Sequence, residues 1–438
     1  MQAPMTASSR PLHVKYLLVG AGLAGSSAAV AIRELDATGS LLLVGQEVVR
    51  PYHRPPLSKD YLLGEVERDQ LPTLPADWFS EHDVQLVTGR RVTWLEPERH
   101  RATFDDGSVV QYEQCLLSFG GMVAPLELPG AGLPGLYYLR SLADADALLT
   151  RIGQALEEGR PHPRGCGRGV VVGAGLLGIE IAAALRSRGL WVELATDSAL
   201  PWSEVAGEAA GRFLLALLQK HEVIVHAANP PTALVGDGRV QRVQLSGGEV
   251  LQCDFAVACV GMHVDRRLLQ NTSIPMGRAV TCDAHCRAGA DQGVERIWAA
   301  GDCSAVFDTR FGKHVRQGHA PIAEATGRLA GRNMVHASRD EPLESWDELP
   351  GWDSRVFGLK ARGWGMPRLI DRRIVRGSTN IDAPDFAEIG VDADGKVCHV
   401  LAIGREGEHD ALRELVAQRA VVTGREEALR DPQQAVEV

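Results

Sequence analysis

Two stretches of the chain share an apolar run that leads directly into a glycine-rich turn. Residues 16–19 read Tyr-Leu-Leu-Val and are followed by glycines at positions 20, 22 and 25. Residues 170–172 are all valine and are followed by glycines at positions 173, 175 and 178. Beyond each turn the sequence is typical of a helix, which ends near residue 36 or 188. The pattern predicts a buried strand, a tight turn and a helix at both places.

The spacing G-x-G-x-x-G in this setting is typical of dinucleotide-binding turns. The first glycine allows the tight turn, the second lets the backbone approach a pyrophosphate, and the third lets the helix pack closely on the strand. The pyrophosphate would lie at the helix N-terminus, where free N–H groups and the helix dipole favour an anion. The candidate residues are Gly20, Gly22, Gly25, Gly173, Gly175 and Gly178.

The strand after each predicted helix ends near a group that could accept hydrogen bonds from a ribose. After residues 40–44 the nearest carboxylate is Glu47, although Gln46 could do the same work and Glu47 could equally be a solvated turn residue. After residues 191–195, Thr196 occupies the expected place and Asp197 follows it. Because no Lys or Arg occurs from 195 to 203, the second turn favours NADH over NADPH.

Further periodic segments predict the remaining elements of the first 337 residues. A small β element is expected over 84–93 with a turn at 105–107. Strands are expected over 112–118, 133–140, 240–245, 255–260 and 296–302, and helices over 144–158, 206–221 and 324–335. Asp302, at the end of the last strand, could hold a ribityl hydroxyl or serve as a helix N-cap or turn residue. Residues 51–62 form a stiff, proline-rich loop with Arg54 and Lys59, which is either part of a phosphate site or an ordinary surface loop.

The composition changes beyond about residue 338, where three tryptophans cluster. A hairpin is predicted from 386–390 and 397–403 around an Asp-Ala-Asp-Gly turn, and a helix over 410–419 follows it. Residues 355–376 are rich in arginine and contain Asp371 as their single carboxylate. This basic stretch is either a docking surface for an acidic partner or a solvated face.

Whole-chain properties exclude several classes of protein. The 438 residues are 45% hydrophobic and 23% charged, which is ordinary for a globular protein, and the net charge of −10 argues against nucleic-acid binding. No apolar run approaches the roughly 18 residues of a membrane span, and the first ten residues lack the apolar core of a secretory signal. We expect a cytoplasmic protein with reduced cysteines and no metal, because the eight cysteines do not stand with histidines at ligand spacing.

Together these patterns predict an α/β fold. It has two Rossmann-like nucleotide-binding domains, each with a three-layer β-α-β arrangement, plus a C-terminal α+β domain. The expected boundaries are 1–130 and 263–337 for the two parts of one nucleotide-binding domain, 131–262 for the other, and 338–438 for the C-terminal domain.

The motifs resemble those of the two-dinucleotide flavoprotein reductases of glutathione-reductase fold. The ferredoxin reductases that serve Rieske oxygenases and cytochromes P450 are most similar, and apoptosis-inducing factor is similar too. The resemblance runs from about residue 15 to 420, and its most specific part is Pro-Tyr-His-Arg-Pro-Pro-Leu-Ser-Lys at 51–59. It implies FAD at the first turn, NAD(P)H at the second, and a monomer or homodimer that passes electrons to a ferredoxin-type iron–sulfur protein, with no nucleic acid and no membrane.

The same resemblance implies roles for individual residues. Lys59 and Glu180 would form the catalytic pair at the junction of flavin and nicotinamide, where a buried cation favours the anionic reduced flavin and needs a counter-charge. The implied FAD contacts are Gly20, Gly22, Leu23, Ala24, Gly25, Glu47, Arg54, Lys59, Val92, Gly120, Arg140, Asp302 and Ala320. The implied NAD(P)H contacts are Gly173, Gly175, Leu177, Gly178, Glu180, Thr196, Asp197, Gly261 and His319.

Some positions depart from the pattern of the reductases that this chain resembles. No redox cysteine pair follows either turn, so disulfide reduction is not expected. Gly318 and Ala320 stand where a Glu and an aromatic residue usually meet the nicotinamide, with His319 filling part of the gap. Two alternatives therefore stay open: a reductase whose acceptor is oxygen, a quinone or a small molecule, and a flavin-containing binding or signalling protein with an impaired NADH site.

Overall fold

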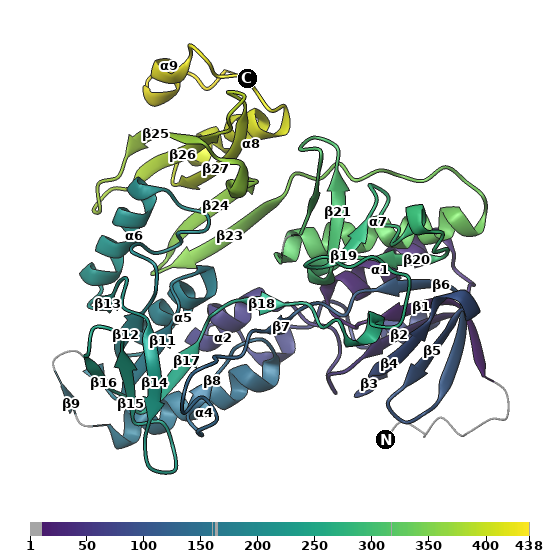
Figure 1. Cartoon of the computed structure of the whole chain (residues 1–438), viewed down its shortest axis with the longest axis horizontal. Helices are drawn as coiled ribbons and strands as arrows, with labels where there is room; N and C mark the ends of the chain where they lie inside the picture. Colours follow the sequence, from purple (N-terminus) through teal and green to yellow (C-terminus); the bar gives the residue numbers. More distant parts are fainter. Residues whose placement is uncertain (1–10, 160, 163–164, 317, 438) are drawn as a thin grey trace. The chain divides into compact units, whose positions relative to one another are not determined.

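The computed structural model describes residues 11–159, 161–162, 165–316 and 318–437 (Figure 1). Within these ranges the chain divides into two compact units. The first unit comprises the described residues of 1–53, 69–122 and 263–348, and the second unit those of 54–68, 123–262 and 349–438. The expectation about a secretory signal concerns residues 1–10, which lie outside the described residues.

The first unit is built on a mixed sheet with the strand order β3-β2-β1-β6-β5-β4, in which β20 also pairs with β6. Strands β1, β2, β3, β6 and β20 pair in parallel, while β4 and β5 are antiparallel additions. The strands are β1 (Leu12–Val19), β2 (Leu41–Gly45), β3 (Val84–Thr88), β4 (Val92–Glu96), β5 (Arg101–Phe104), β6 (Val109–Leu117) and β20 (Ile297–Ala299). A smaller sheet joins β19 (Val280–Cys282), β21 (Ser304–Asp308) and β22 (Lys313–Val315).

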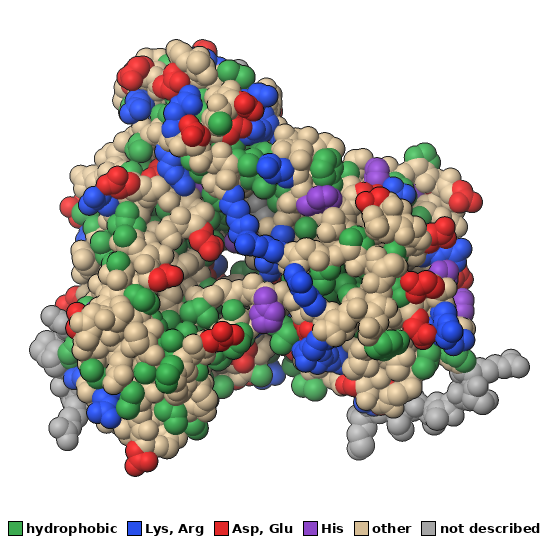
Figure 2. All heavy atoms as spheres, viewed as in Figure 1, with side chains coloured by type: hydrophobic (Ala, Val, Ile, Leu, Met, Phe, Trp, Pro, Cys, Tyr) green, Lys and Arg blue, Asp and Glu red, His purple; other side chains and the backbone are tan. Residues whose placement is uncertain are grey.

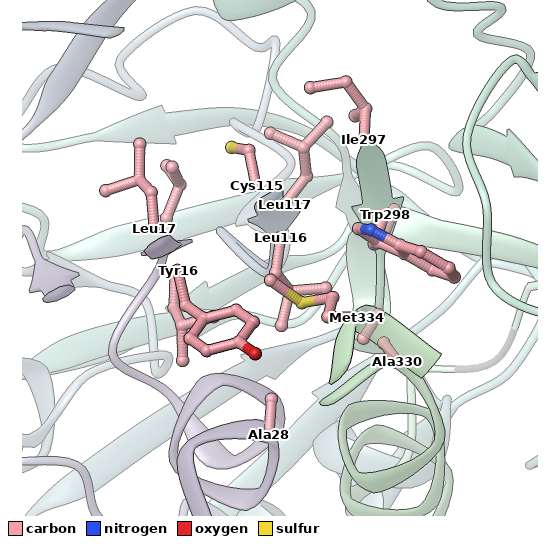
Figure 3. Close-up of a cluster of buried hydrophobic side chains, with 14 of the residues drawn as sticks. Tyr16, Leu17, Ala28, Cys115, Leu116, Leu117, Ile297, Trp298, Ala330 and Met334 are labelled. Atoms are coloured by element: carbon pink, nitrogen blue, oxygen red, sulfur yellow. The ribbon is translucent and has the colours of Figure 1, made fainter. Parts of the chain in front are cut away.

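Helices α1 (Leu23–Leu35) and α7 (Ala320–Ser338) pack closely together beside the strands of the first unit. A Cβ atom at Gly327 would lie 2.3 Å from the Ala24 carbonyl oxygen, and one at Gly331 would lie 2.6 Å from that of Ala28. Figure 3 shows Ala28 of α1 and Met334 of α7 beneath the apolar side chains of β1, β6 and β20. The short helix α3 (Trp78–Glu81) completes the helices of this unit.

The second unit contains a parallel sheet with the order β13-β12-β11-β17-β8. These strands are β8 (Leu136–Tyr137), β11 (Arg168–Val172), β12 (Trp191–Ala195), β13 (Ile224–His226) and β17 (Phe255–Ala258). Its helices are α2 (Asp60–Leu63), α4 (Leu142–Glu158), α5 (Leu176–Ser187) and α6 (Glu208–Lys220). An antiparallel sheet of β14 (Pro231–Val235), β15 (Arg242–Leu245) and β16 (Val250–Gln252) and the ribbon of β9 (Pro161–His162) and β10 (Gly165–Cys166) are also present.

The C-terminal part of the second unit is an antiparallel sheet with the order β23-β24-β27-β26-β25. It consists of β23 (Gly351–Val356), β24 (Leu359–Gly365), β25 (Arg372–Ser378), β26 (Asp385–Val391) and β27 (Val397–Ile403), with helices α8 (His409–Ala417) and α9 (Glu426–Arg430). Glu388 of β26 accepts hydrogen bonds from the backbone N–H groups of Gly207 (2.6 Å) and Ala210 (2.8 Å) and so caps α6. This cap joins the C-terminal sheet to the rest of the second unit.

The predicted α/β class with Rossmann-like parallel sheets is confirmed, and the C-terminal hairpin lies where it was expected. Three predictions of local structure were wrong. Residues 55–58 form a 3₁₀ helix instead of a loop and lead into α2. The strand expected over 133–140 shrinks to β8, whose two residues pair with Ala256 and Val257 of β17. Helix α7 begins at Ala320 instead of 324, since Pro321 is well tolerated in a first helical turn.

Short strands β7 (Met122–Val123) and β18 (Met262–His263) lie where the chain passes from one unit to the other. Among the described residues, no helix is long and apolar enough to cross a membrane.

Candidate dinucleotide sites

The first glycine-rich turn connects β1 to α1, and two of its glycines are required by the fold itself. Gly20 has φ of +122°, and a Cβ atom there would lie 2.2 Å from the Ser118 carbonyl oxygen. A Cβ atom at Gly25 would lie 2.0 Å from the Gly20 carbonyl oxygen. Gly22 is different, because its φ of −99° suits any residue and a Cβ atom there would meet nothing within 4 Å.

The second turn, between β11 and α5, repeats this arrangement. Gly173 has φ of +102°, and its Cβ atom would lie 2.4 Å from the Cys259 carbonyl oxygen. A Cβ atom at Gly178 would lie 2.0 Å from the Gly173 carbonyl oxygen. Gly175 again has an unstrained φ of −72° and open space where its Cβ atom would be.

The middle glycine of each turn is therefore not explained by the fold. Helices α1 and α5 begin at glycine N-caps that make no side-chain hydrogen bond to the first helical turn. Helix α4, in contrast, begins with a complete capping box made by Ser141 and Asp144. A side-chain-free N-terminus leaves backbone N–H groups to an anion, and open space at the second glycine admits one. The chain thus fits a dinucleotide pyrophosphate at both turns.

The rim of the first turn contains several of the residues expected to contact FAD. The Ser118 hydroxyl donates to the Gly20 carbonyl oxygen (2.9 Å) and so fixes the turn. Glu47 accepts a hydrogen bond from the Tyr52 hydroxyl (2.8 Å). Asp302 is buried in a 3₁₀ turn at Gly301–Cys303, and its backbone carbonyl oxygen accepts from Nε of Arg316 (3.1 Å).

Other expected FAD contacts of the first unit differ in accessibility. Leu23 and Ala24 begin α1, Ala320 begins α7, and Gly120 has a left-handed φ of +72°. The side chains of Ala24 and Val92 are both buried in the hydrophobic core of the unit. A cofactor could therefore meet Val92 through its backbone only.

The rim of the second turn contains most of the expected NAD(P)H contacts. Thr196 is buried, and its hydroxyl oxygen accepts from the Ser198 N–H (3.1 Å), whereas Asp197 is exposed. Gly261 has φ of +106°, and its carbonyl oxygen accepts from the Ala124 N–H (2.9 Å). Leu177 lies in the first turn of α5.

The segment before α7 belongs to the first unit and includes the positions that depart from the reductase pattern. His319 is the N-cap residue of α7, and its side chain makes no capping hydrogen bond. Gly318 is exposed, and Gln317 lies outside the described residues.

Lys59 and Glu180 form an ion pair within the second unit, with 3.0 Å between Nζ and Oε1. Both side chains are largely buried, since they are 12% and 7% exposed. Sequence reasoning missed two further members of this cluster. The hydroxyls of Ser58 and Ser354 each donate to Glu180 at 2.6 Å. The position of Ser58 next to Lys59 could have indicated its role, but nothing in the sequence around Ser354 indicates a contact with Glu180.

Arg54 and Arg140, also expected to contact FAD, belong to the second unit together with Lys59. Arg54 Nη1 donates to the Arg140 carbonyl oxygen (2.6 Å), and the Arg140 N–H donates to Asp144 Oδ2 (3.1 Å). The residues that begin α4 thereby also fix the backbone beside Arg54.

All eight cysteines, each within the described residues, are free thiols. Burial, with a smaller contribution from the Glu180 carboxylate, raises the pKa of Cys259 to about 12. Burial also raises the pKa of Cys303, next to Asp302, to about 12. These thiols stay protonated at neutral pH and so are poor nucleophiles. Within the described ranges no three His, Cys, Asp or Glu side chains gather as metal ligands.

The basic stretch 355–376 is largely neutralised inside the second unit. Fully buried Arg376 pairs with Glu408 at 2.6 Å, Arg372 with Glu426 at 3.1 Å, and Arg373 with Glu388 at 3.4 Å. On the visible face of this region cations and carboxylates are interspersed (Figure 2). The sequence left open a docking surface or a solvated face. In the structure Arg372, Arg373 and Arg376 instead form ion pairs within the second unit, while Lys360, Arg362 and Arg368 are exposed.

Comparison with known proteins places the chain among oxidoreductases. Residues 14–327 match the family model described as pyridine nucleotide-disulphide oxidoreductase. The chain is 32% identical over 407 residues to the benzene 1,2-dioxygenase system ferredoxin–NAD(+) reductase subunit of Pseudomonas putida, covering 92% of this chain and 93% of that protein. It is 27% identical over 419 residues to rhodocoxin reductase of Rhodococcus erythropolis, covering 95% and 93%.

A solved structure shares the fold over nearly the whole length. The ferredoxin reductase for the CYP199A2 system from Rhodopseudomonas palustris matches with a TM-score of 0.86 and 24% identity, covering 96% of this chain and 98% of that one. The family model covers well over half of the chain and includes both glycine turns. The chain therefore belongs to the pyridine nucleotide-disulphide oxidoreductase family.

Proposed function

We propose that the protein is an FAD-dependent reductase that passes electrons from NAD(P)H to a small ferredoxin-type iron–sulfur protein serving an oxygenase or a cytochrome P450. The observation that supports it most is the duplicated turn whose middle glycine, Gly22 or Gly175, the fold does not need. Bound FAD supplies the redox chemistry, because it accepts a hydride and releases electrons singly. The names of the relatives, which are ferredoxin reductases of oxygenase systems, support the choice of acceptor.

In this proposal the first unit holds FAD. Gly22 and the N–H groups that begin α1 at Leu23 and Ala24 bind the pyrophosphate, and Gly20 and Gly25 shape the turn. Glu47 accepts hydrogen bonds from the adenosine ribose, and Asp302 holds the ribityl chain. Further contacts are assigned to Arg54, Lys59, Val92, Gly120, Arg140 and Ala320.

The second turn holds the nicotinamide nucleotide. Gly175 and the start of α5 at Leu177 bind its pyrophosphate, with Gly261 and His319 as further contacts. We assign the ribose to Asp197 instead of Thr196, because Thr196 is buried and its hydroxyl is engaged in the local turn. An exposed carboxylate and the lack of a cation over 195–203 favour NADH.

Lys59 and Glu180 are assigned to the reacting end of the cofactors. The Lys59 ammonium stabilises negative charge that develops on the flavin, and Glu180 supplies the counter-charge that allows a cation to be buried there. No side chain needs to act as a general acid or base.

We also propose a domain arrangement, an assembly state and a location for the protein. Residues 1–130 and 263–337 form the FAD-binding domain, 131–262 the NAD(P)H-binding domain and 338–438 the C-terminal domain. The protein works as a monomer or homodimer without nucleic acid or membrane. We place it in the cytoplasm, which the free state of the eight cysteines supports.

The experiment starts from the visible spectrum of the purified protein, followed by NADH or NADPH without air. We expect flavin bands in the spectrum and faster bleaching with NADH than with NADPH. Cytochrome c should be reduced only when a [2Fe-2S] ferredoxin is added. If the flavin bleaches but passes its electrons only to oxygen or a quinone, one of these is the acceptor instead of a ferredoxin. Flavin that stays oxidised would favour a binding or signalling role, for which exposed Gly318 is the relevant feature. A colourless protein that takes up no FAD would overturn the proposal.

A further inference from the structure

Three hydrogen-bond donors, from two separate segments of the second unit, surround the Glu180 carboxylate. Lys59 Nζ lies 3.0 Å from Oε1, and the Ser354 hydroxyl donates to the same oxygen at 2.6 Å. The Ser58 hydroxyl donates to Oε2, also at 2.6 Å. Ser58, Glu180 and Ser354 are all buried. Both oxygens of the carboxylate are therefore fixed from within the protein.

The two serines supply what the ion pair alone lacks. A buried ion pair gains little free energy unless the remaining lone pairs of the carboxylate are also satisfied. A single lysine at the end of a flexible stem leaves the carboxylate free to rotate. Donors on both oxygens fix the plane of the Glu180 carboxylate and, through it, the position of the Lys59 ammonium.

Ser354 is an unusual residue for its place in the C-terminal sheet. Along β23 the buried side chains are Trp352, Ser354 and Val356, which alternate with exposed Asp353 and half-buried Arg355. A hydroxyl in an otherwise apolar row is expected to have a specific hydrogen-bond partner, and here that partner is Glu180, 174 positions earlier in the chain. The next residue, Arg355, pairs with Asp60 and with Glu65 at 3.2 Å. Strand β23 therefore holds both Glu180 and the residue that follows Lys59.

We propose that Ser354 is a positioning residue for the Lys59–Glu180 pair, with Ser58 as the second anchor. The C-terminal sheet then sets the geometry of the charge that acts on the flavin, although it lies far from both glycine turns in sequence. Ser354 acts through Glu180 and need not touch the cofactor itself. This inference rests on the proposed role of the pair in flavin reduction.

The test uses full-length, FAD-loaded protein and anaerobic stopped-flow reduction by NADH. Ser354→Ala should lower the limiting rate constant of flavin reduction about tenfold, with the NADH concentration at half-saturation unchanged. Ser354→Thr keeps the hydroxyl and should stay within about threefold of the unmodified protein. Ser378→Ala, at an exposed serine that ends β25, is the matched control and should have no effect. The flavin absorbance per protein checks that each variant is loaded.

A double-mutant cycle separates positioning from a loss of packing. In a Glu180→Ala protein the Ser354 hydroxyl has no carboxylate to hold, so adding Ser354→Ala should change the rate no further. An equal tenfold loss in both backgrounds, or an unchanged rate for Ser354→Ala alone, would overturn the inference while leaving the role of the pair intact. Unchanged rates for both Lys59→Met and Glu180→Ala would overturn the proposed role of the pair itself, and this inference with it.

Discussion

The two glycine-rich turns have nearly the same backbone, but the helices that follow them do different work. Helix α1 packs its buried small residues against α7, whose Gly327 and Gly331 lie against the backbone of Ala24 and Ala28. Helix α5 instead presents Glu180 to the hydroxyls of two serines and to the ammonium of Lys59. One helix completes a core, and the other carries a buried charge.

The two turns agree at their glycines but differ at a residue that follows them. In each turn the third glycine is followed two residues later by a buried polar side chain, Ser27 in α1 and Glu180 in α5. The glycines are fixed by backbone sterics and by room for a pyrophosphate, which both turns need. The residue two places after the third glycine differs between the two turns, and there the two units diverge.

The largest effect is expected where the fold itself demands glycine. Gly25→Ala and Gly178→Ala each place a Cβ atom 2.0 Å from a carbonyl oxygen, so each should lower the free energy of unfolding by about 3–5 kcal/mol. Chemical denaturation of the apoprotein measures this loss. Gly153→Ala is the control, because it lies within α4 with open space at its Cβ and should stabilise the protein by about 0.5–1 kcal/mol. Unchanged stability of Gly25→Ala would show that the turn can accommodate a Cβ atom at this position.

A smaller but functional effect is expected at the charge that distinguishes the second region. Lys59→Met keeps most of the side-chain volume and removes the cation, so flavin reduction by NADH should slow about 100-fold. The apparent affinity for NADH should change little. Lys220→Met removes an exposed lysine paired with Asp382 and serves as the control. Rapid-mixing kinetics that are identical for Lys59→Met and the unmodified protein would rule out the role of this cation.

The third effect concerns Gly22, the middle glycine of the first turn, which the fold does not need. Gly22→Ala should leave the unfolding free energy of the apoprotein within about 0.5 kcal/mol of the original value, because its Cβ meets no protein atom. The purified protein should nevertheless bind FAD at least tenfold more weakly, since the methyl group occupies the approach to the pyrophosphate. Titration of apoprotein with FAD measures this difference. Normal FAD affinity would show that the first turn does not hold the pyrophosphate.

The smallest effect concerns the exposed carboxylate beside the second turn. Asp197→Ala should weaken NADH about fivefold and NADPH less, because a ribose hydrogen bond is lost and a negative charge near a 2′-phosphate is removed. Steady-state constants for both nucleotides measure the ratio. Asp237→Ala, at an exposed position in the β14–β15 loop, is the control. Equal changes in the constants for NADH and NADPH would show that Asp197 does not contact the ribose.

The parts of the fold that sequence predicts well are those with strict local requirements. The turns at Gly20 and Gly173 need glycine for both sterics and ligand, so the pattern marks them clearly. The Lys59–Glu180 contact was inferred from family resemblance, and the structure places the two side chains together. The roles of these residues toward FAD and NAD(P)H stay predictions.

The contacts that the sequence did not predict depend on packing between segments that are distant in the chain. Ser354 was missed because a serine in a strand gives no sign of a partner 174 positions away. The basic stretch was interpreted from its own residues, whereas the carboxylates that neutralise Arg373 and Arg376 come from Glu388 and Glu408 on other elements. Similarly, nothing in the sequence near Val92 shows that its side chain belongs to the core, which leaves only its backbone for the predicted contact with FAD.

The central claim is that the two turns bind two different dinucleotides, and Gly175→Ala tests it most directly. The measurement is the NADH dependence of anaerobic flavin reduction in this variant. We predict an unchanged amount of bound FAD, together with an NADH concentration at half-saturation raised at least tenfold. Loss of FAD from Gly175→Ala, or an NADH dependence equal to that of the unmodified protein, would contradict the assignment of the two turns.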